Sequence, residues 1–495
     1  MDRPGQSAPI APALFVALTA DDPATLQARI RDRIRRLVTE GALPVGARLP
    51  SARTLAAQLG VSRTTIDAAI RASIAEGWLV SRPRSGVFVA AGPVPPPPPT
   101  APPDDPGVAP RLSATVSALV PDLHARGRLG AFHLSRPALD AFPVDAWAKI
   151  LARRAARTTL AQLDYGGESP ELRAAIASLV SVGRGWAVDP DQVLLFDGGQ
   201  SAIGFAARAT LDPGDRAWVE DPGYPAARAA IAATGAIPVP VPVDADGLRV
   251  DLGVAAAPDA RLVYTTPSCQ FPLAVPLALD RRRALVRWAA STGAMIVEDD
   301  YEVELGHDGP PLPALAALDG GRRVLYVHSF SRTMFPALRI GYLIAPAPLV
   351  GRLRDARDAL QPPLASLPQL ALVEFVAEGH YARHLRRMRV VHRERRTAVL
   401  EAVARVDPAT LRLRPTSAGL HLLADLAPGI DAGAVRRAAS ARGVEVMPLA
   451  AFQATPGAPD ALVLGFGALR PDRAEAAVAA LVAAIDEVRI ERVTR

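Results

Sequence analysis

The stretch 327–342 reads VHSFSRTMFPALRIGY, and it joins two short apolar runs, Val324–Val327 and Tyr342–Ile344. Neither run alternates polar with apolar residues, which is typical of strands buried on both faces of a mostly parallel sheet. The polar residues Ser329, Ser331 and Arg332 follow the first run at the carboxyl end of its strand. Open α/β sheets bind ligands at that edge. The stretch therefore predicts two buried strands with a ligand-binding segment between them.

Short apolar runs of the same kind recur through most of the chain, at Val193–Phe196, Ala217–Val219, Leu262–Tyr264 and Met295–Val297. The segments between them have helical periodicity, as in Arg281–Ser291. Strands that alternate with helices indicate a doubly wound, mostly parallel α/β domain. We expect this domain to occupy residues 113–495.

Three helical patterns and a β-hairpin precede it. Apolar residues recur every third or fourth position across 26–37, which predicts an amphipathic helix. Ser51 and Ser62 each stand where an N-cap is expected, and Gly60 separates the two short helices. Two short apolar runs within 78–89 predict a two-stranded wing. Together these patterns indicate a winged helix-turn-helix.

A proline-rich segment separates the two regions. Ten of the 18 residues from 93 to 110 are proline. Such a segment favours polyproline II, a semi-rigid spacer of about 3.1 Å per residue. We therefore expect a DNA-binding domain at 1–91 and a linker at 92–112.

Composition narrows the class of protein. The net charge is +6, and the segment from Asp21 to Ala90 carries 11 Arg against 6 Asp and Glu, which is the footprint of a nucleic-acid binder. Cys269 is the only cysteine, so no internal disulfide forms. No apolar run reaches the roughly 18 residues of a membrane span, and no signal peptide is recognisable. We expect a cytoplasmic protein without a metal site or a membrane association.

The N-terminal motifs resemble the GntR-type winged helix-turn-helix: GARLPSAR at 46–53, LGVSRTT at 59–65, EGWL at 76–79 and SGVFV at 85–89. The resemblance implies that the following residues contact operator DNA: Ser51, Arg53, Ser62, Arg63, Thr64, Thr65 and Gly86. Asp67 departs from some family members, which have arginine there. Its carboxylate either points away from the duplex or reads a cytosine amino group.

Motifs at the strand ends of the second region resemble fold-type I aminotransferases: GGQS at 198–201, EDPGYP at 220–225, TPSCQFP at 266–272, EDDY at 298–301 and SFSRT at 329–333. With the winged helix, this order resembles the MocR/GabR subfamily of GntR regulators. The resemblance implies a homodimer with a small C-terminal subdomain, a small-molecule effector and a site for pyridoxal 5'-phosphate.

The resemblance also implies individual roles at that site. Asp299 would pair with the pyridine nitrogen, Tyr301 would donate to the phenolic oxygen of the ring, and Tyr224 would stack on the ring face. Tyr165 would reach the phosphate from a partner subunit. The remaining phosphate ligands would be Gly199, Gln200, Ser329 and Arg339.

Arg332 stands where the family has the lysine that forms a Schiff base with the cofactor. A guanidinium is permanently charged and offers no amine to an aldehyde. Cys269 replaces a histidine, Leu273 and Ala274 replace Thr-Gly, and the run 462–466 carries no arginine for a substrate carboxylate. The departures therefore gather at the amine and on the substrate side. Lys149, the only lysine, lies in an N-terminal helix and is a poor substitute.

These features favour a sequence-specific transcriptional regulator over an enzyme, and we predict no catalytic residue. In one version the second domain holds pyridoxal phosphate, pyridoxamine phosphate or an amine adduct non-covalently, with Arg332 close to the ligand. In another version that domain only dimerises, and Arg332 pairs with Asp299 in place of a pyridine. A pyridoxal phosphate-dependent aminotransferase is the disfavoured alternative, because Arg332 cannot form the Schiff base.

Overall fold

The structure is a computed structural model. It describes residues 25–92, 130–134, 136–164, 166–305, 312–414, 416, 419–455, 457 and 460–493. The chain divides into two compact units, residues 1–111 and 112–495. From residue 93 onward the expected linker lies outside the described residues, and so does Tyr165.

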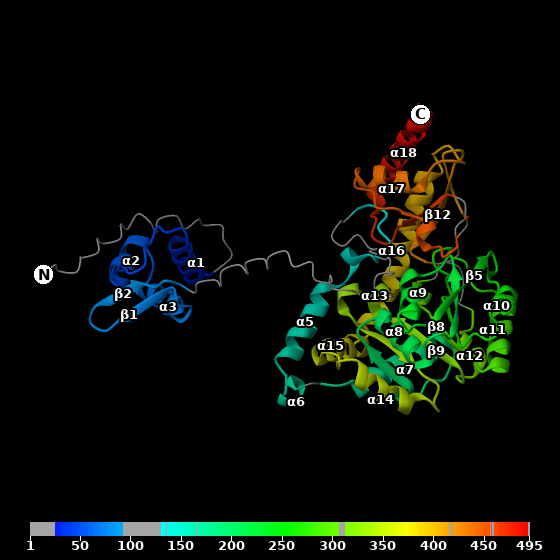
Figure 1. Cartoon of the computed structure of the whole chain (residues 1–495), viewed down its shortest axis with the longest axis horizontal. Coiled ribbons are helices and arrows are strands. Elements are labelled where there is room, and N and C mark those ends of the chain that lie inside the picture. Colours follow the sequence, from blue (N-terminus) through cyan, green and yellow to red (C-terminus); the bar gives the residue numbers. More distant parts are fainter. Residues whose placement is uncertain are drawn as a thin grey trace, which may run out of the picture. The chain divides into compact units, whose positions relative to one another are not determined.

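The first unit is a three-helix bundle with a hairpin (Figure 1). Helix α1 (Leu26–Thr39) buries one apolar stripe against α2 (Ala52–Leu59) and α3 (Arg63–Ala75). Ser51 caps α2 by accepting the Thr54 N–H at 3.1 Å, and Ser62 caps α3 in the same way. Gly60 ends α2 with a φ of +64°, a left-handed conformation that glycine adopts without strain. The predicted helix-turn-helix is confirmed.

The predicted wing is also present. Strands β1 (Leu79–Arg82) and β2 (Gly86–Val89) pair antiparallel, from Leu79 opposite Val89 to Arg82 opposite Gly86. Leu79 and Val89 are buried against the helices, whereas the hairpin end is exposed. The wing therefore presents its turn to solvent.

The second unit is built on an eight-stranded sheet with the strand order β3-β10-β9-β8-β7-β4-β5-β6. The strands are β3 (Val193–Phe196), β4 (Arg216–Asp221), β5 (Ile237–Asp244), β6 (Gly247–Leu248), β7 (Leu262–Thr265), β8 (Met295–Asp299), β9 (Val324–Ser329) and β10 (Gly341–Ile344). Neighbouring strands from β9 to β5 are parallel. The doubly wound architecture is confirmed.

Strand β10 differs from the parallel majority, because it runs antiparallel to both β9 and β3. Eleven residues, 330–340, connect β9 to β10. A parallel crossover needs about a dozen residues or more, usually with a full helix, so this short connection turns the chain back. The connection holds the short helix α13 (Phe330–Thr333) at the strand ends, and α13 carries Arg332.

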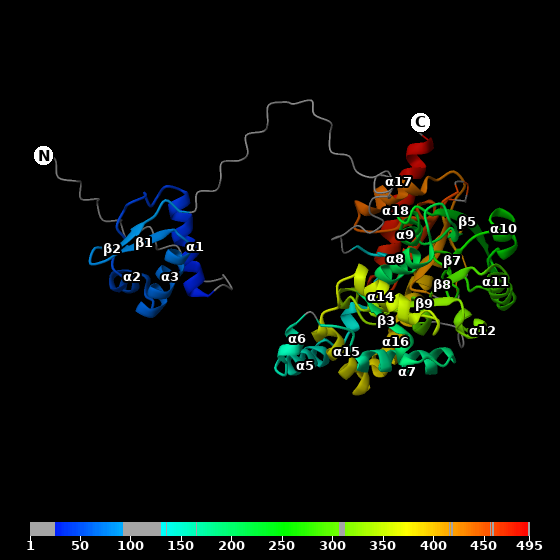
Figure 2. The same cartoon turned by 60° about the horizontal axis from the view of Figure 1, so that its bottom comes forward.

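Helices cover both faces of the sheet (Figures 1 and 2). One face packs against α7 (Pro170–Arg184), α11 (Leu279–Thr292), α12 (Leu315–Asp319) and α15 (Ser366–Ala377). The other face packs against α8 (Gly199–Thr210), α9 (Pro225–Ala232) and α14 (Val350–Leu360). Alternate strand residues divide between the two cores, as with Leu194 and Leu195. This two-sided burial explains why the strand sequences are continuous apolar runs.

The chain ends in a smaller subdomain. Its sheet has the order β11 (Leu411–Leu413), β12 (His421–Leu426), β14 (Ala461–Gly465) and β13 (Met447–Pro448), all paired antiparallel. The long helix α16 (His380–Val403) and the helices α17 (Ala432–Ser440) and α18 (Pro471–Val493) pack on it. Both views show α17 and α18 at the end of this unit opposite α5 (Val144–Ala155) and α6 (Leu160–Leu163). Among the described residues no helix is long and apolar enough to cross a bilayer.

Candidate ligand site and nucleic-acid interface

Arg332 lies on α13, at the carboxyl ends of the parallel strands. Phe330 and Thr333 of this helix are buried, whereas the Arg332 side chain keeps 17% of its surface exposed. The Arg332 Nε lies 3.5 Å from Oε1 of Glu302, and its guanidinium carbon lies 5.9 Å from the centre of the Tyr301 ring. The fixed positive charge therefore lies in the site beside a carboxylate and an aromatic ring.

Glu302 is the buried partner of this charge. Only 2% of its side chain is exposed, and its Oε2 accepts the Leu420 N–H at 2.9 Å. Burial raises the pKa of the Glu302 carboxyl, and the charge of Arg332 opposes that rise. Because Leu420 directly precedes β12, Glu302 connects the large sheet to the C-terminal subdomain.

Asp299 ends β8 and is almost fully buried. Its Oδ2 accepts the Tyr264 hydroxyl at 2.7 Å. Burial raises the pKa of Asp299 to about 6, although the Tyr264 hydrogen bond opposes the shift. Within the described part of the chain no arginine is within ion-pairing distance of Asp299. The expected alternative of an Arg332–Asp299 pair is wrong, because Arg332 turns to Glu302 instead.

The expected phosphate ligands converge at the N-terminus of α8. Gly198 precedes this helix with a φ of +85°, and no side chain caps the helix. A Cβ at Gly198 would lie 3.1 Å from the Arg339 guanidinium carbon, and one at Gly199 would lie 3.6 Å from the Ser329 Oγ. A helix N-terminus with an arginine and a serine beside it is suited to a phosphate. In this structure the Arg339 Nε donates to Asp197 at 3.0 Å.

Three further expected residues have protein partners of their own. The Gln200 Nε2 donates to the Ala226 carbonyl at 2.9 Å. The Tyr301 hydroxyl donates to the Cys269 carbonyl at 3.0 Å. The Tyr224 ring packs edge-on against Phe271, with the ring centres 6.0 Å apart. The described residues thus bring the expected ring and phosphate groups to one edge of the sheet.

Cys269 belongs to the packed wall between the site and the C-terminal sheet. It is buried, and burial raises the pKa of its thiol well above the ordinary value. A Cβ at Gly419 would lie 3.0 Å from the Cys269 Sγ and 3.3 Å from the Glu302 Oε2. The same Cβ would lie 3.3 Å from the His421 ring, and burial lowers the pKa of His421 to about 4. The thiol is therefore a packing group, and His421 is neutral at pH 7.

The residues present fit a pyridoxal phosphate-like molecule in two of its three attachments. Asp299 is a buried carboxylate suited to a protonated ring nitrogen. The uncapped start of α8 is suited to the phosphate. The third attachment is missing, since Arg332 has no amine, and Lys149 is an exposed residue of α5.

Sequence reasoning missed Glu302, Tyr264 and His328. Tyr264 stood inside an apolar strand pattern, and Glu302 follows the recognised EDDY motif directly. His328 precedes Ser329 on β9 and is buried, with its Nε2 3.2 Å from the Glu304 carboxylate and its Nδ1 2.6 Å from the Asp300 carbonyl. Burial opposes the charged form, but Glu304 outweighs it and raises the pKa of His328 to about 9. The site edge therefore holds a second buried cation.

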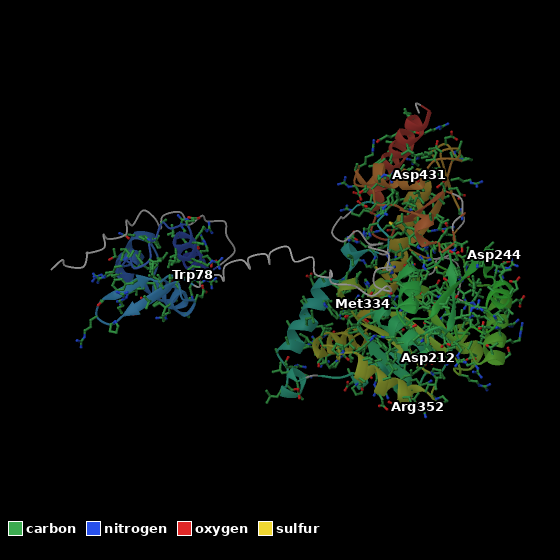
Figure 3. All side chains as sticks on the ribbon, viewed as in Figure 1. Trp78, Asp212, Asp244, Met334, Arg352 and Asp431 are labelled. Carbon is green, nitrogen blue, oxygen red and sulfur yellow. The ribbon has the colours of Figure 1, made fainter. Side chains whose placement is uncertain are left out.

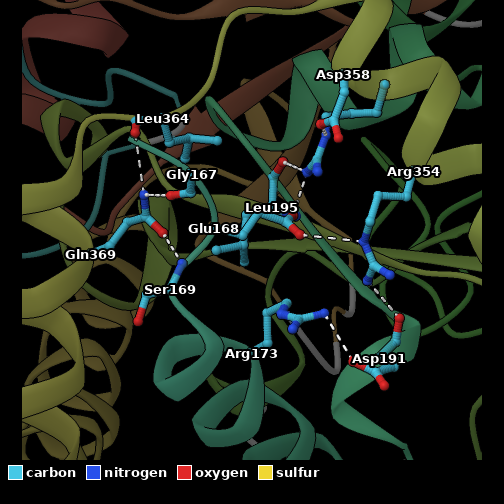
Figure 4. A network of polar contacts seen from close by, with 11 residues as sticks. Gly167, Glu168, Ser169, Arg173, Asp191, Leu195, Arg354, Asp358, Leu364 and Gln369 are labelled. Carbon is cyan, nitrogen blue, oxygen red and sulfur yellow. Dashed lines mark hydrogen bonds and ion pairs between the residues drawn. The ribbon is translucent and has the colours of Figure 1, made fainter. Parts of the chain in front are cut away.

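A polar network holds the segment that follows Tyr165 (Figure 4). Glu168 accepts hydrogen bonds from the Leu195 N–H and from Arg357, and Gln369 binds both the Ser169 N–H and the Gly167 carbonyl. Of these residues, Gly167, Glu168 and Arg357 border a surface depression of about 670 Å³. The network fixes residues 167–169 to α14, α15 and β3.

The expected DNA-binding residues lie at the starts of α2 and α3 and on the wing. Ser51, Arg53, Ser62, Arg63, Thr64 and Gly86 are exposed, and Thr65 is half-buried. Arg63 lies 3.5 Å from Asp67, one turn along α3, so the Asp67 carboxylate points back toward Arg63. Gly86 has a φ of +110°, and a Cβ there would lie 3.1 Å from the Arg48 Nε. The positive φ and this close approach explain why glycine is needed.

Comparison with known proteins agrees with both regions. Residues 132–481 match the model of aminotransferase class I and II, and residues 26–89 match that of bacterial regulatory proteins, gntR family. The chain is 33% identical over 464 residues to the probable rhizopine catabolism regulatory protein MocR of Rhizobium meliloti, covering 92% of this chain and 93% of that protein. It is 32% identical over 463 residues to the HTH-type pyridoxine biosynthesis transcriptional regulator PdxR of Corynebacterium glutamicum, covering 92% and 94%.

A solved structure also resembles the second unit. It is the alpha-aminoadipate aminotransferase LysN of Thermus thermophilus, complexed with N-(5'-phosphopyridoxyl)-L-leucine. The TM-score is 0.68 at 27% identity, and the match covers 76% of this chain and 96% of that chain.

Proposed function

Since the chain belongs to the MocR-like regulators of the gntR family, which join a winged helix to an aminotransferase class I and II domain, we propose that it is a DNA-binding transcriptional regulator. Its aminotransferase-like domain serves as the sensor of a small phosphorylated ligand. Such a protein works where the chromosome lies, which we take to be the cytoplasm.

Operator binding rests on the two serine caps of the helix-turn-helix. Because Ser51 and Ser62 cap α2 and α3, Arg53 and Arg63 lie in the first turns of these helices, where both side chains are exposed. Arginines there are suited to phosphates and to guanine edges, and helix N-termini themselves favour phosphate. The contact set is Ser51, Arg53, Ser62, Arg63, Thr64, Thr65 and Gly86.

Ligand sensing rests on Asp299, a buried carboxylate that no described arginine neutralises. A protonated ring nitrogen would complete it, and the start of α8 with Ser329 and Arg339 would hold a phosphate. Gly199, Gln200, Tyr224 and Tyr301 complete the proposed site. The ligand is pyridoxal phosphate, pyridoxamine phosphate or an amine adduct. It is held without a covalent bond, and the domain has no transaminase activity because Arg332 offers no amine.

A homodimer completes the proposal. Leu160 and Leu163 of α6 are 86% and 72% exposed, and they stand a few residues before Tyr165, the residue expected to reach a partner's phosphate site. Apolar side chains this exposed are suited to an interface. The competing version, in which the domain dimerises without any ligand, differs only in its failure to bind pyridoxamine phosphate.

The test is a gel shift with upstream DNA of the gene at moderate salt. Arg63→Ala should abolish operator retention at the protein concentration that just saturates the wild type, because loss of a base contact costs about 1–3 kcal/mol and lowers affinity about 5- to 150-fold. Arg71→Ala is the matched control, since Arg71 is an exposed arginine near the other end of α3, and it should retain binding. Retention by Arg63→Ala equal to that of the wild type would remove Arg63 from the contact set.

A further inference from the structure

The guanidinium of Arg332 has fewer hydrogen-bond partners than a mostly buried charged group requires. Its Nη1 is buried and has no hydrogen-bond partner among the described residues. Its Nε is 3.5 Å from Glu302, whereas charge-assisted N–H···O bonds measure about 2.7–2.9 Å. A buried charged donor without an acceptor is costly, and an arriving anion would relieve that cost.

The neighbouring side chains place the Arg332 guanidinium on the side of the site where the ligand is expected. The guanidinium lies over the Tyr301 ring, and its charge opposes the burial-driven rise in the pKa of Tyr224, the expected ring-stacking residue. His421 on β12 also lies within the reach of this charge but is neutral. Strand β14 carries no arginine for a carboxylate. Arg332 is thus the arginine beside the expected ring position, whereas Arg339 lies at the phosphate end.

We propose that Arg332 binds a carboxylate of the ligand, so that the site selects a molecule with two anionic groups, its phosphate at α8 and its carboxylate at Arg332. The chemical class is a pyridoxyl phosphate derivative of an α-amino acid, bound as a preformed, non-covalent adduct. A planar guanidinium fork matches a carboxylate in two parallel hydrogen bonds. This inference rests on the proposed ligand-sensing function and adds to it the ligand's second charge.

Glu302 competes with that carboxylate in this arrangement. Its Oε1 faces Arg332, and its Oε2 is engaged by the Leu420 N–H. Glu302→Gln keeps a carbonyl oxygen for Leu420 and removes the competing charge. It should therefore bind the carboxylate-bearing ligand more tightly, by about threefold or more.

The experiment compares two probes by isothermal titration calorimetry on the full-length protein. One is N-(5'-phosphopyridoxyl)-L-leucine, and the other is the same adduct without the carboxylate, N-(5'-phosphopyridoxyl)-3-methylbutylamine. The wild type should prefer the first by about tenfold or more, the usual effect of a hydrogen bond to a charged group. Arg332→Gln should reduce the preference to about one, and Glu302→Gln should increase it.

Arg352→Gln is the control, because Arg352 is an exposed arginine of α14 (Figure 3). It should retain the wild-type preference. Equal affinity of the wild type for both probes, or an undiminished preference in Arg332→Gln, overturns the inference while leaving the ligand site in place. Failure of both probes and of pyridoxamine phosphate to bind overturns the ligand-sensing function as well, whereas operator binding is measured separately. A misfolded Arg332→Gln protein would also lose the preference for the carboxylate-bearing probe. Glu302→Gln is therefore the second variant, because it is expected to increase that preference, which a folding defect does not do.

Discussion

Replacing Asp299 by asparagine should change stability and ligand affinity in opposite directions. Asp299 is buried at the end of β8, and its side chain accepts a hydrogen bond from Tyr264. Asparagine has nearly the same shape and keeps an oxygen for the Tyr264 hydroxyl, so the substitution removes the charge and replaces the other carboxylate oxygen by an amide NH2. If Asp299 serves ligand binding, the substitution should raise stability and lower ligand affinity. If Asp299 serves packing, stability should fall and affinity should not change.

The stability term follows from the pKa of Asp299, which burial raises from 3.8 to about 6. The folded protein binds this proton more tightly than the unfolded chain does, so stability falls as the pH rises from 3.8 through about 6. Above pH 7 the ionised carboxylate destabilises the fold by about 3 kcal/mol. Asp299→Asn should therefore raise the free energy of unfolding by up to that amount at about pH 7.5, and by little at about pH 4.

The expected change in ligand affinity runs in the opposite direction, because Asp299→Asn should weaken binding. Without the carboxylate, a protonated ring nitrogen loses a charge-assisted hydrogen bond worth about 1.5–3 kcal/mol. Pyridoxamine phosphate should bind Asp299→Asn about 10- to 150-fold more weakly at pH 7.5. Urea unfolding measures the first term and titration calorimetry the second. Asp212→Asn, at an exposed position (Figure 3), should change neither by more than about 0.5 kcal/mol.

An Asp299→Asn protein that is less stable than the wild type and binds pyridoxamine phosphate equally well would refute this reasoning. Asp299 would then be a structural residue at a strand end. The proposed site would lose the group that attracts the ring.

Two further predictions concern the neighbours of Asp299. Arg332→Lys in a Lys149→Arg background leaves position 332 with the sole lysine. Treatment with pyridoxal phosphate and borohydride should then add one phosphopyridoxyl group, measured by intact mass, whereas Lys149→Arg alone should gain none at this site. An unmodified double variant would contradict the proposed ring and phosphate contacts. His328, with its pKa raised to about 9, should contribute about 3 kcal/mol of stability below pH 6.5 that is lost as the pH rises through 9. Urea unfolding of His328→Gln at pH 6 and pH 10 checks this, and an equal deficit at both values would show that the imidazole is not charged.

Much of the fold follows from local patterns. Serine caps at 51 and 62, and the continuous apolar runs at 193–196 and 324–327, each reflect one dominant physical requirement, either a helix start or two-sided burial. The antiparallel direction of β10 was harder to foresee. It depends on the length of the connection 330–340, and its strand sequence is as apolar as those of its parallel neighbours.

The site was predictable where a role belongs to one residue and less so where it belongs to a pair. Asp299 and Ser329 of the proposed site stand in motifs that predict strand ends, and the structure places them at the ends of β8 and β9. The partner of Arg332 could not, because Glu302 and Asp299 are both carboxylates of one segment, and only the fold decides which one faces α13. Tyr264 was hidden for a related reason, since a buried tyrosine in an apolar strand gives no sign that its hydroxyl has an acidic partner.

The pairing of Arg332 with Glu302 bears on how a site with arginine in place of the Schiff-base lysine binds its ligand. A lysine holds its cofactor covalently, whereas a guanidinium binds anions that come and go with their concentration, which suits a sensor. The same Glu302 accepts a hydrogen bond from Leu420 at the start of the C-terminal sheet. In our proposal a carboxylate that takes over Arg332 leaves Glu302 without its cation at this junction. Occupancy of the site is thereby linked to the contact between the large sheet and the C-terminal subdomain, and that link requires no chemistry from residue 332.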